Sequence, residues 1–297
     1  VDLSAELGAL DVALVMQHLP TGIMHEQLVS WLDQAVKAGR MEQLSLRFLG
    51  APGDFPFDND NGVFDLRLRL ADIEFQFNRQ WPSLSDTAAQ IQFLNRGLRI
   101  AGGGGAVANV PVSFVSARIE NLWEPKLSID ARLDGELGPM HTLLRASPLL
   151  GFDGTLTRLR PTGAARVDLG LYFPFERRPM ELEGELSLQD ARVAIDQPAI
   201  ALSELNGVVG FDRSGVRWQG LRGRFSGRPF VSDAQTRREE GQSRIEVNAD
   251  TRLALSDWAG LQGLGDQSAG QAAWRLSWQG PGFNQGEIGR GRAELSV

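Results

Sequence analysis

The most regular pattern in the chain is the alternation of apolar and polar residues in GVFDLRLRLADIEFQF, residues 62–77. Successive side chains of a strand point to opposite faces, so the apolar residues from Phe64 to Leu70 share one face and the charged residues between them share the other. At Asp72 the phase inverts, and either a tight turn or a β-bulge there would keep the following apolar residues on the same side. The pattern predicts two strands in tandem, with one apolar and one ionic face.

Most of the remaining chain alternates in the same way. Short runs rich in Val, Ile, Leu and Phe lie between Gly, Pro, Asp and Asn residues, which is typical of strands joined by tight turns. The polar stretch AQTRREEGQS, residues 234–243, is instead interpreted as an exposed loop. We therefore predict a mainly β protein built from antiparallel meanders, with further strands at 42–50, 88–94, 97–102, 111–122, 126–137, 165–173, 181–190, 191–196, 206–211, 215–220, 243–256 and 272–280.

One amphipathic helix is predicted at MHEQLVSWLDQAVKAGR, residues 24–40. Its apolar residues recur with the 3.6-residue period of a helix and form one stripe: Leu28, Trp31, Leu32, Ala35 and Val36. Gly39 stands where a left-handed C-cap is expected. Shorter helices are predicted at residues 11–18 and 141–150, so helix is the minority structure.

An internal repeat is visible when LRLADIEF is aligned with LSLQDARV, which fixes an offset of 118 residues, 190 minus 72. Without a gap, the same offset pairs identical residues further along the chain: Leu84 with Leu202, Phe93 with Phe211, Gly97 with Gly215, Arg99 with Arg217, Gly105 with Gly223 and Pro111 with Pro229. One supersecondary unit therefore occurs twice, over about residues 62–112 and 180–230. Repeats of this kind usually stack and share an apolar layer, because one unit cannot bury its own apolar face.

Composition narrows the function. The 297 residues carry a formal charge of −7, which disfavours a nucleic-acid partner because phosphate binding needs clustered basic residues. There is no cysteine, which excludes disulfides and thiolate chemistry. No run of about 18 apolar residues and no signal peptide are present. The chain begins with Val1 and ends within another alternating stretch, so we interpret it as a fragment of a larger protein.

No constellation of catalytic or metal-binding residues is found. His18 and His25 are seven residues apart and His141 is remote, which is not a metal-ligand spacing. GGGG at 102–105 lacks the Lys-Ser/Thr of a phosphate loop and is interpreted as a hairpin or bulge, and DNDNG at 58–62 as a turn. Carboxylates lie on the polar phase of strands, where a solvated face explains them. We therefore expect no enzyme activity, no metal and no cofactor.

A set of motifs occurs in a characteristic order over roughly residues 15–231: LP-x(3)-MHEQLVSWLDQAVKAGR, DFPF, NGVFDLRLRLADIEF, QWPSLSD, GLRI, ASPLL and LNGVVGFDRSGVRWQGLRGRFSGRPF. This combination resembles the YhdP group of AsmA-like proteins of Gram-negative bacteria. The resemblance implies a repeating β-groove, an elongated and curled antiparallel sheet with one or two short helices. It further implies a lipid-transport protein of the periplasm, anchored in the inner membrane, that carries phospholipid toward the outer membrane.

The site that the resemblance implies is a surface rather than a catalytic centre. Residues 42–297 are expected to form the groove, and residues 1–41 a strand and helix segment that braces it through Leu28, Trp31, Leu32 and Val36. The ligand would be phospholipid, membranes would be contacted by parts of the full-length protein outside this fragment, and envelope protein partners stay open. The expected lipid-facing residues are the inward phase of each strand: Phe64, Leu66, Leu68, Leu70, Ile73, Phe75, Phe77, Ile91, Phe93, Leu127, Ile129, Leu169, Leu186, Leu188, Val193, Ile195, Val209 and Phe211.

Two alternatives stay open from the residues alone. The apolar stripes could be the sealed core of a structural β-scaffold that binds a partner. A carbohydrate-active enzyme with paired carboxylates is a weaker alternative, because no carboxylate pair stands out in an apolar context. The helix at 24–40 could also plug, cap or brace the groove, or pack on the outside of the sheet.

Overall fold

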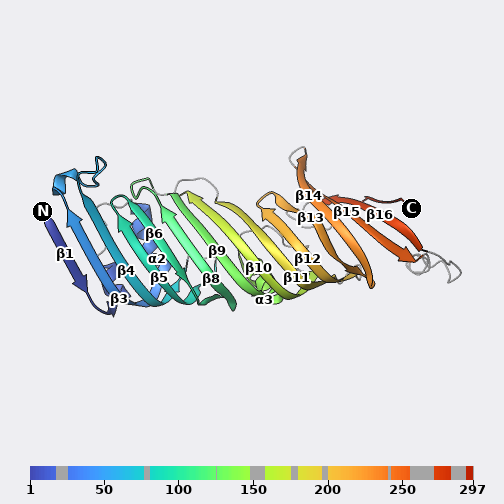
Figure 1. The fold of residues 1–297 in the computed structure, drawn as a ribbon, viewed down its shortest axis with the longest axis horizontal. Helices are drawn as coiled ribbons and strands as arrows, with labels where there is room; N and C mark the ends of the chain where they lie inside the picture. The colour runs from blue at the N-terminus through green and yellow to red at the C-terminus, as the bar shows by residue number, and fades with distance from the viewer. Residues whose placement is uncertain are drawn as a thin grey trace. The chain divides into compact units, whose positions relative to one another are not determined.

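The computed structural model of the chain is mainly β, with antiparallel strands and a few short helices (Figure 1). It describes residues 1–17, 26–76, 81–124, 126–147, 158–174, 180–195, 200–239, 242–254, 271–281 and 292–296. The mainly β, antiparallel fold expected from the alternation is therefore confirmed.

The chain divides into two compact units. Unit 1 comprises Val1–Asp134 and Asp168–Leu182, and unit 2 comprises Gly135–Val167 and Glu183–Val297. Strand β10, Leu159–Pro174, contributes residues to both units.

Unit 1 is an antiparallel sheet in which β1 pairs with β3, and β3, β4, β5, β6, β8 and β9 follow in ladder order. The short strand β2 lies beside β3, and β7 pairs with both β5 and β8. Figure 1 shows these strands from blue to green. Their bounds are β1 Asp2–Leu7, β2 Leu10–Asp11, β3 Val36–Leu49, β4 Val63–Phe75, β5 Leu84–Leu94, β6 Gly97–Gly103, β7 Ala106–Val107, β8 Val110–Ile119 and β9 Lys126–Glu136, with helices α1 Val12–Met16, α2 Glu26–Ala35 and the 3-10 turn η2 Pro52–Asp54.

Unit 2 is a meander in which each strand from β11 to β17 pairs antiparallel with the next. Short hairpins join β12 to β13 and β13 to β14, as the turn residues between alternating runs predict. The bounds are β11 Glu181–Ile195, β12 Ile200–Asp212, β13 Gly215–Phe225, β14 Arg228–Glu239, β15 Gln242–Ala254, β16 Gln271–Pro281 and β17 Arg292–Ser296, with helix α3 Leu137–Ala146.

The inversion at Asp72 is a β-bulge inside one strand. Asp72 has φ 53°, and the register shifts there, so that Leu70 pairs with Ala89 and Ile73 pairs with Thr87. The bulge interpretation is confirmed, whereas the prediction of two tandem strands is wrong because the ladder continues through the bulge to Phe75. An extra residue on one strand moves the following side chains to the opposite phase, which keeps both apolar sets on one face.

The backbone repeats at the same offset of 118 residues. Asp190 in β11 has φ 49°, and the register shifts there in the same way, with Leu188 opposite Gly207 and Ala191 opposite Leu205. Two further features recur. Asp86 and Glu204 both have positive φ, and so do both residues of the hairpin turns Ala108-Asn109 and Ser226-Gly227. The strand pairs β4–β5 and β11–β12 therefore share one register, bulges included.

The two copies lose their common register within the third strand, because the ladder between β5 and β6 is continuous whereas the ladder between β12 and β13 is shifted. In copy 1 a bulge in β8 separates Val112 from Phe114, whereas the ladder between β14 and β15 is continuous. In copy 2 the irregularity lies in β13, between Trp218 and Leu221, where Gly220 has φ 64°. The bulges thus set which residues of the later strands face the apolar side.

Three sequence expectations need correction. The helix predicted at 24–40 ends at Ala35, and Val36 begins β3 opposite Phe75, because ladder pairing overrides helical periodicity there. Residues 234–239 lie in β14 rather than in a loop, since Ala234 and Thr236 face the apolar side and Thr236 exchanges two hydrogen bonds with the Val216 backbone. Helix α3 begins at Leu137, earlier than predicted, and His18, His25 and residues 148–150 lie outside the described residues.

The GGGG stretch, expected to form a hairpin or bulge, lies within a locally irregular strand: Gly102 and Gly103 end β6, and β7 beyond Gly105 pairs with the same strands, β5 and β8. Gly104 and Gly105 have φ 75° and 74° and connect β6 to β7. A Cβ on Gly105 would lie 2.1 Å from the Ser85 carbonyl oxygen, so only glycine fits this close approach of two backbones.

Candidate functional site: the apolar sheet faces

Apolar residues form unbroken rows across the strands of unit 1. Residues directly opposite each other in an antiparallel ladder share a face, so the strand register defines each row. One row runs from β3 to β8 through Leu46, Leu66, Phe93, Leu98 and Ile119. The next row runs through Leu44, Leu68, Ile91, Ile100, Ala117 and Ile129. Unit 1 therefore carries one continuous apolar face.

This face is largely sealed by protein. Leu68 is 4% exposed and Phe93 is 2% exposed. Val12 of α1 belongs to the same buried cluster, and Val29 and Trp31 of α2 pack against it. The Trp31 ring meets Phe75 edge to face, with ring centroids 5.8 Å apart. Both N-terminal helices therefore cover part of the apolar face.

An aromatic cluster lies over the strand ends of unit 1 that α2 does not cover. The loop between β3 and β4 places Phe55 and Phe57 against Phe48 and Phe64, with centroid distances of 5.5 to 6.0 Å for three of the pairs. Phe55 also contacts Trp123, which follows β8, at 5.9 Å. Phe57 is 1% exposed, so this loop is a fixed part of the core.

The opposite face of unit 1 is ionic. Arg67 donates two hydrogen bonds to the Asp65 carboxylate, at 3.1 and 2.7 Å, and Gln92 donates a third at 2.9 Å. Burial alone would raise the pKa of Asp65, but these hydrogen bonds outweigh burial and hold it below its usual value. The face is thus built from solvated, charge-assisted contacts.

Unit 2 carries the equivalent apolar rows. One runs through Leu186, Val209, Trp218, Ala234, Val247 and Trp278 on six successive strands. Trp218 donates its indole N–H to the Ser232 hydroxyl at 3.2 Å, which satisfies its only polar atom on this face. Leu186 is only half-buried, whereas its counterpart Leu68 in unit 1 is buried; Val209 and Trp218 are half-buried, as are their counterparts Ile91 and Ile100.

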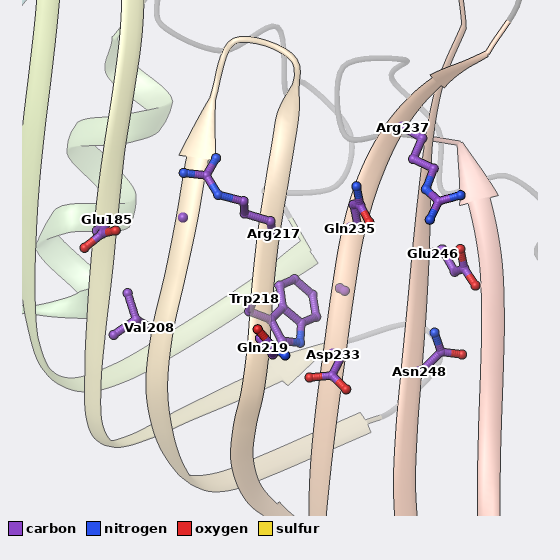
Figure 2. Close-up of a pocket in the computed structure, with 12 residues that line it drawn as sticks. Glu185, Val208, Arg217, Trp218, Gln219, Asp233, Gln235, Arg237, Glu246 and Asn248 are labelled. Atoms are coloured by element: carbon purple, nitrogen blue, oxygen red, sulfur yellow. The ribbon is translucent and has the colours of Figure 1, made fainter.

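Unit 2 contains a depression of about 720 Å³ that is lined mostly by residues of the polar phase and also by Trp218 and Ala234 (Figure 2). Figure 2 shows that Arg217, Gln235 and Glu246 line it from three neighbouring strands, and these residues are register partners on the ionic face. Nearby, burial opposes ionisation of Asp212, but hydrogen bonds from Ser214 and Gly215 and the charge of Arg217 lower its pKa. Both of these shifted carboxylates, Asp65 and Asp212, move toward the ionised form, the opposite of what a general acid requires.

No group of three or more His, Cys, Asp or Glu residues able to hold a metal occurs in the described part of the chain. Within the same ranges, no helix is long and apolar enough to cross a membrane.

The structure brings most of the predicted groove residues of unit 1 together. Phe64, Leu66, Leu68, Leu70, Ile73, Phe75, Ile91, Phe93, Leu127 and Ile129 belong to or pack against one cluster. Leu169 is half-buried in β10. In unit 2, Leu186, Leu188, Val193, Ile195, Val209 and Phe211 are all half-buried on β11 and β12. Of the predicted groove residues, Phe77 lies outside the described residues. Of the predicted helix residues, Trp31 contacts the apolar face and Val36 lies in β3, and the side chains of Leu28 and Leu32 are not described.

Several residues of these faces were missed by sequence reasoning. Leu44 and Leu46 belong to a strand that was predicted, and the alternation LSLRF already placed them on one phase. Trp218 and Val247 are likewise in alternating runs. Phe55 and Trp123, however, meet through loops far apart in sequence, and no local pattern predicts that contact.

Each unit is an antiparallel sheet with one apolar and one ionic face, and the strand pairs β4–β5 and β11–β12 have the same register. The chain is therefore an amphipathic β-sheet protein built from a repeat. A model of the YhdP protein family matches residues 1–289, and the chain belongs to this family. It is similar to the intermembrane phospholipid transporter YhdP of Escherichia coli K12, with 24% identity over 266 residues, 89% of this chain. The chain spans only about a fifth, 21%, of that relative's length. No solved structure matches the chain.

Proposed function

We propose that the chain is a non-enzymatic segment of a periplasmic phospholipid conduit, in which the apolar sheet faces shield acyl chains between the inner and outer membranes. Membership of the YhdP family supports lipid transport as the general function. The name of the Escherichia coli relative, an intermembrane phospholipid transporter, supports phospholipid as the ligand. The proposal needs neither a cofactor nor a catalytic residue.

Physical chemistry explains why such a surface is needed. A phospholipid with two chains carries about 30 methylenes, and at ~0.8 kcal/mol each their transfer into water would cost on the order of 20 to 25 kcal/mol. Side chains such as Leu, Val and Phe replace the bilayer interior without forming directional bonds. A lipid on such a face can move along it, because no single position holds it more tightly than the next.

The observation that carries the proposal is the half-buried apolar row of unit 2. Leu186 and Val209 occupy the same strand positions as Leu68 and Ile91, within a shared register. Leu68 is buried, whereas Leu186 keeps part of its surface exposed. Apolar rows that remain open after folding mark binding surfaces for apolar ligands. We therefore place the acyl chains on the apolar face of unit 2 first.

Lipid content of matched variants tests the proposal. Leu188→Asp puts a charge on the half-buried apolar face, and Ser187→Asp puts the same charge on the adjacent residue of the opposite face. Each protein, expressed in bacteria and purified without detergent, is extracted and its phospholipid quantified by mass spectrometry. We expect near-stoichiometric phospholipid on the parent chain and on Ser187→Asp, and severalfold less on Leu188→Asp, because a desolvated carboxylate is costly beside an acyl chain.

A structural scaffold is the second candidate function, favoured by the sealed face of unit 1. In that case all apolar rows are protein core, and Leu188→Asp would unfold unit 2. Circular dichroism separates the two: loss of the β signal supports the scaffold, whereas an unchanged spectrum with lost lipid supports the conduit. A parent chain that is well folded and free of lipid would refute the proposed function.

A further inference from the structure

The depression of unit 2 extends across five strands, from β11 to β15. Neighbouring strands lie about 4.8 Å apart, so the lining residues are spread over four spacings, or roughly 19 Å. A single phosphate or metal ion would occupy only a small part of this length. The depression therefore suits an extended ligand, and it lies mostly on the ionic face, to which the proposed function assigns no ligand.

A glycine opens the middle of the depression. Gly210 lies in one row of the ionic face, between Glu185 and Arg217. At the offset of 118 residues its counterpart is Gln92, which in copy 1 donates a hydrogen bond to Asp65 across the face. Arg217 instead lies across β12 in copy 2, where a Cβ on Gly210 would be 3.0 Å from its Nε. Copy 2 thus has open space at a position where copy 1 has a bridging side chain.

The polar lining of the depression indicates a ligand without a large net charge. Among the described residues, two arginines and three carboxylates line it, so neither sign of charge dominates. An anionic polymer would meet the carboxylates, and a cation would meet the arginines. Three amide side chains, those of Gln219, Gln235 and Asn248, also line it. Because an amide both donates and accepts hydrogen bonds, this lining suits a ligand rich in hydroxyl and amide groups.

Asp233 and Asn248 hold an acceptor and a donor side by side. They are directly opposite in the ladder between β14 and β15, where the Cβ atoms of such a pair lie about 4.5 to 5.5 Å apart. The Gly220 amide donates to Oδ1 of Asp233 at 2.6 Å, so Oδ2 is the acceptor that a ligand can use. The Ser277 hydroxyl donates to Oδ1 of Asn248 at 2.5 Å, so Nδ2 is the corresponding donor. Figure 2 shows both side chains on neighbouring strands of the depression.

An acetamido group complements this pair. Its N–H can donate to Oδ2 of Asp233, and its carbonyl oxygen can accept from Nδ2 of Asn248. Val208, which is 46% exposed in the same depression, provides an apolar contact for the C–H groups of a sugar ring. An extended peptide also carries amide groups, but it binds at free strand edges, and β14 and β15 are each paired on both sides. A sugar polymer with acetamido groups therefore fits better than a peptide.

We propose that the depression of unit 2 binds an extended glycan that carries N-acetyl groups, and that Asp233 and Asn248 recognise one of its acetamido groups. The glycan would lie mainly on the ionic face, whereas the proposed function places acyl chains on the apolar face. The protein could then bind a glycan and a phospholipid at the same time. Glycan binding is independent of the proposed function, and each can be refuted without the other.

Ligand-detected NMR titrations of the 297-residue chain test the glycan. The probes are chitotetraose, cellotetraose, which has the same linkage but hydroxyl groups in place of the acetamido groups, and N-acetylated tetraalanine. We expect chitotetraose to bind roughly tenfold more tightly than either of the others, because they leave the Asp233 and Asn248 pair incompletely bonded. Equal binding of cellotetraose or of the peptide, or no binding of chitotetraose at millimolar concentration, would overturn the proposal.

Three variants locate the site. Asp233→Asn keeps the acceptor for the Gly220 amide but replaces the acceptor Oδ2 by a donor, and Gly210→Gln puts the copy 1 side chain into the depression. Asp250→Asn is the matched control, because Asp250 lies on the same face of β15 in an exposed ion pair with Arg275. We expect the first two variants to weaken chitotetraose binding roughly tenfold and the control to leave it unchanged.

Circular dichroism verifies that each variant is folded. The two substitutions in the depression are on different strands, β14 and β12, so either one decides the outcome if the other variant does not fold. Undiminished chitotetraose binding in a folded variant with a substitution in the depression would overturn the assignment of this site. An equal loss in Asp250→Asn would also overturn it, because the effect would then not depend on the depression.

Discussion

The two copies of the repeat share a backbone but differ in what covers their apolar face. Leu70 opposite Ala89 in copy 1 corresponds to Leu188 opposite Gly207 in copy 2, and each pair precedes a bulge. In copy 1 Leu70 and Ala89 are buried in the cluster that contains Val12 of α1 and against which Val29 and Trp31 of α2 pack, whereas in copy 2 Leu188 is half-exposed. The same pattern of paired strands can thus form either a sealed core or an open apolar surface. The helices and loops that pack on the strands decide which of the two results.

The largest expected effect separates the two copies directly. Leu68 is only 4% exposed, so Leu68→Asp would bury an unpaired carboxylate in the apolar cluster. We expect this to lower the free energy of unfolding by more than about 3 kcal/mol. Leu186→Asp, the equivalent substitution in copy 2, should cost roughly half as much or less, since water still reaches that site. Urea unfolding followed by circular dichroism measures both. Equal losses would mean that the two faces are equally sealed.

A smaller effect is expected at the bulges, where the copies should behave alike. Asp72 and Asp190 have φ 53° and 49°, a region that β-branched residues adopt only with strain. We expect Asp72→Val and Asp190→Val each to lower the free energy of unfolding by about 1 to 2 kcal/mol. The controls Asp72→Gly and Asp190→Gly should be close to neutral, because the Arg40–Asp72 ion pair is exposed. A loss of stability at only one of the two bulges would show that the same backbone geometry does not have the same energetic effect in both copies.

The smallest effect concerns the ionic face. The pKa of Asp65 is lowered, so its ionised form stabilises the fold above the ordinary aspartate value of 3.8, and this stabilisation is lost as the pH falls through the lowered pKa. Asp65→Asn should therefore reduce stability modestly at neutral pH and by less at about pH 2, because the stabilisation by the ionised carboxylate is lost as the pH falls through the lowered pKa. Denaturant unfolding at the two pH values checks this. A substitution effect that does not change with pH would contradict the assigned role of the Arg67 and Gln92 hydrogen bonds.

The sequence predicted the faces of the sheet better than their covers. Alternation placed Phe64 to Leu70 on one side, and the phase change at Asp72 indicated the bulge, because both are local properties of a strand. The end of α2 was wrong because Val36 fits a helical stripe and a strand equally well, and pairing with Phe75 decides between them. The polar β14 was missed because ladder hydrogen bonds, such as those of Thr236, stabilise it without an apolar sequence.

The covers depend on contacts between distant segments. The Phe55–Trp123 contact joins two loops, and the Trp31–Phe75 contact joins a helix to a strand residue 44 positions further along the chain. Another pair of Phe-Pro-Phe motifs, at 55–57 and 173–175, obeys the same 118-residue offset, yet Phe173 and Pro174 end a strand while Phe55 and Pro56 form a loop. Sequence identity within the repeat therefore does not fix the role of a residue in the cover.

The most direct test of the account is to map where an acyl chain lies. The chain is loaded with a phospholipid that carries a photoactivatable diazirine in its acyl chain, irradiated, digested and analysed by mass spectrometry. The account predicts adducts on the apolar face of unit 2, at Leu186, Leu188 and Val209, and none at Ser187 or Val208 on the opposite face. Adducts confined to the ionic face, or a bound lipid that labels neither face of β11 and β12, would contradict it.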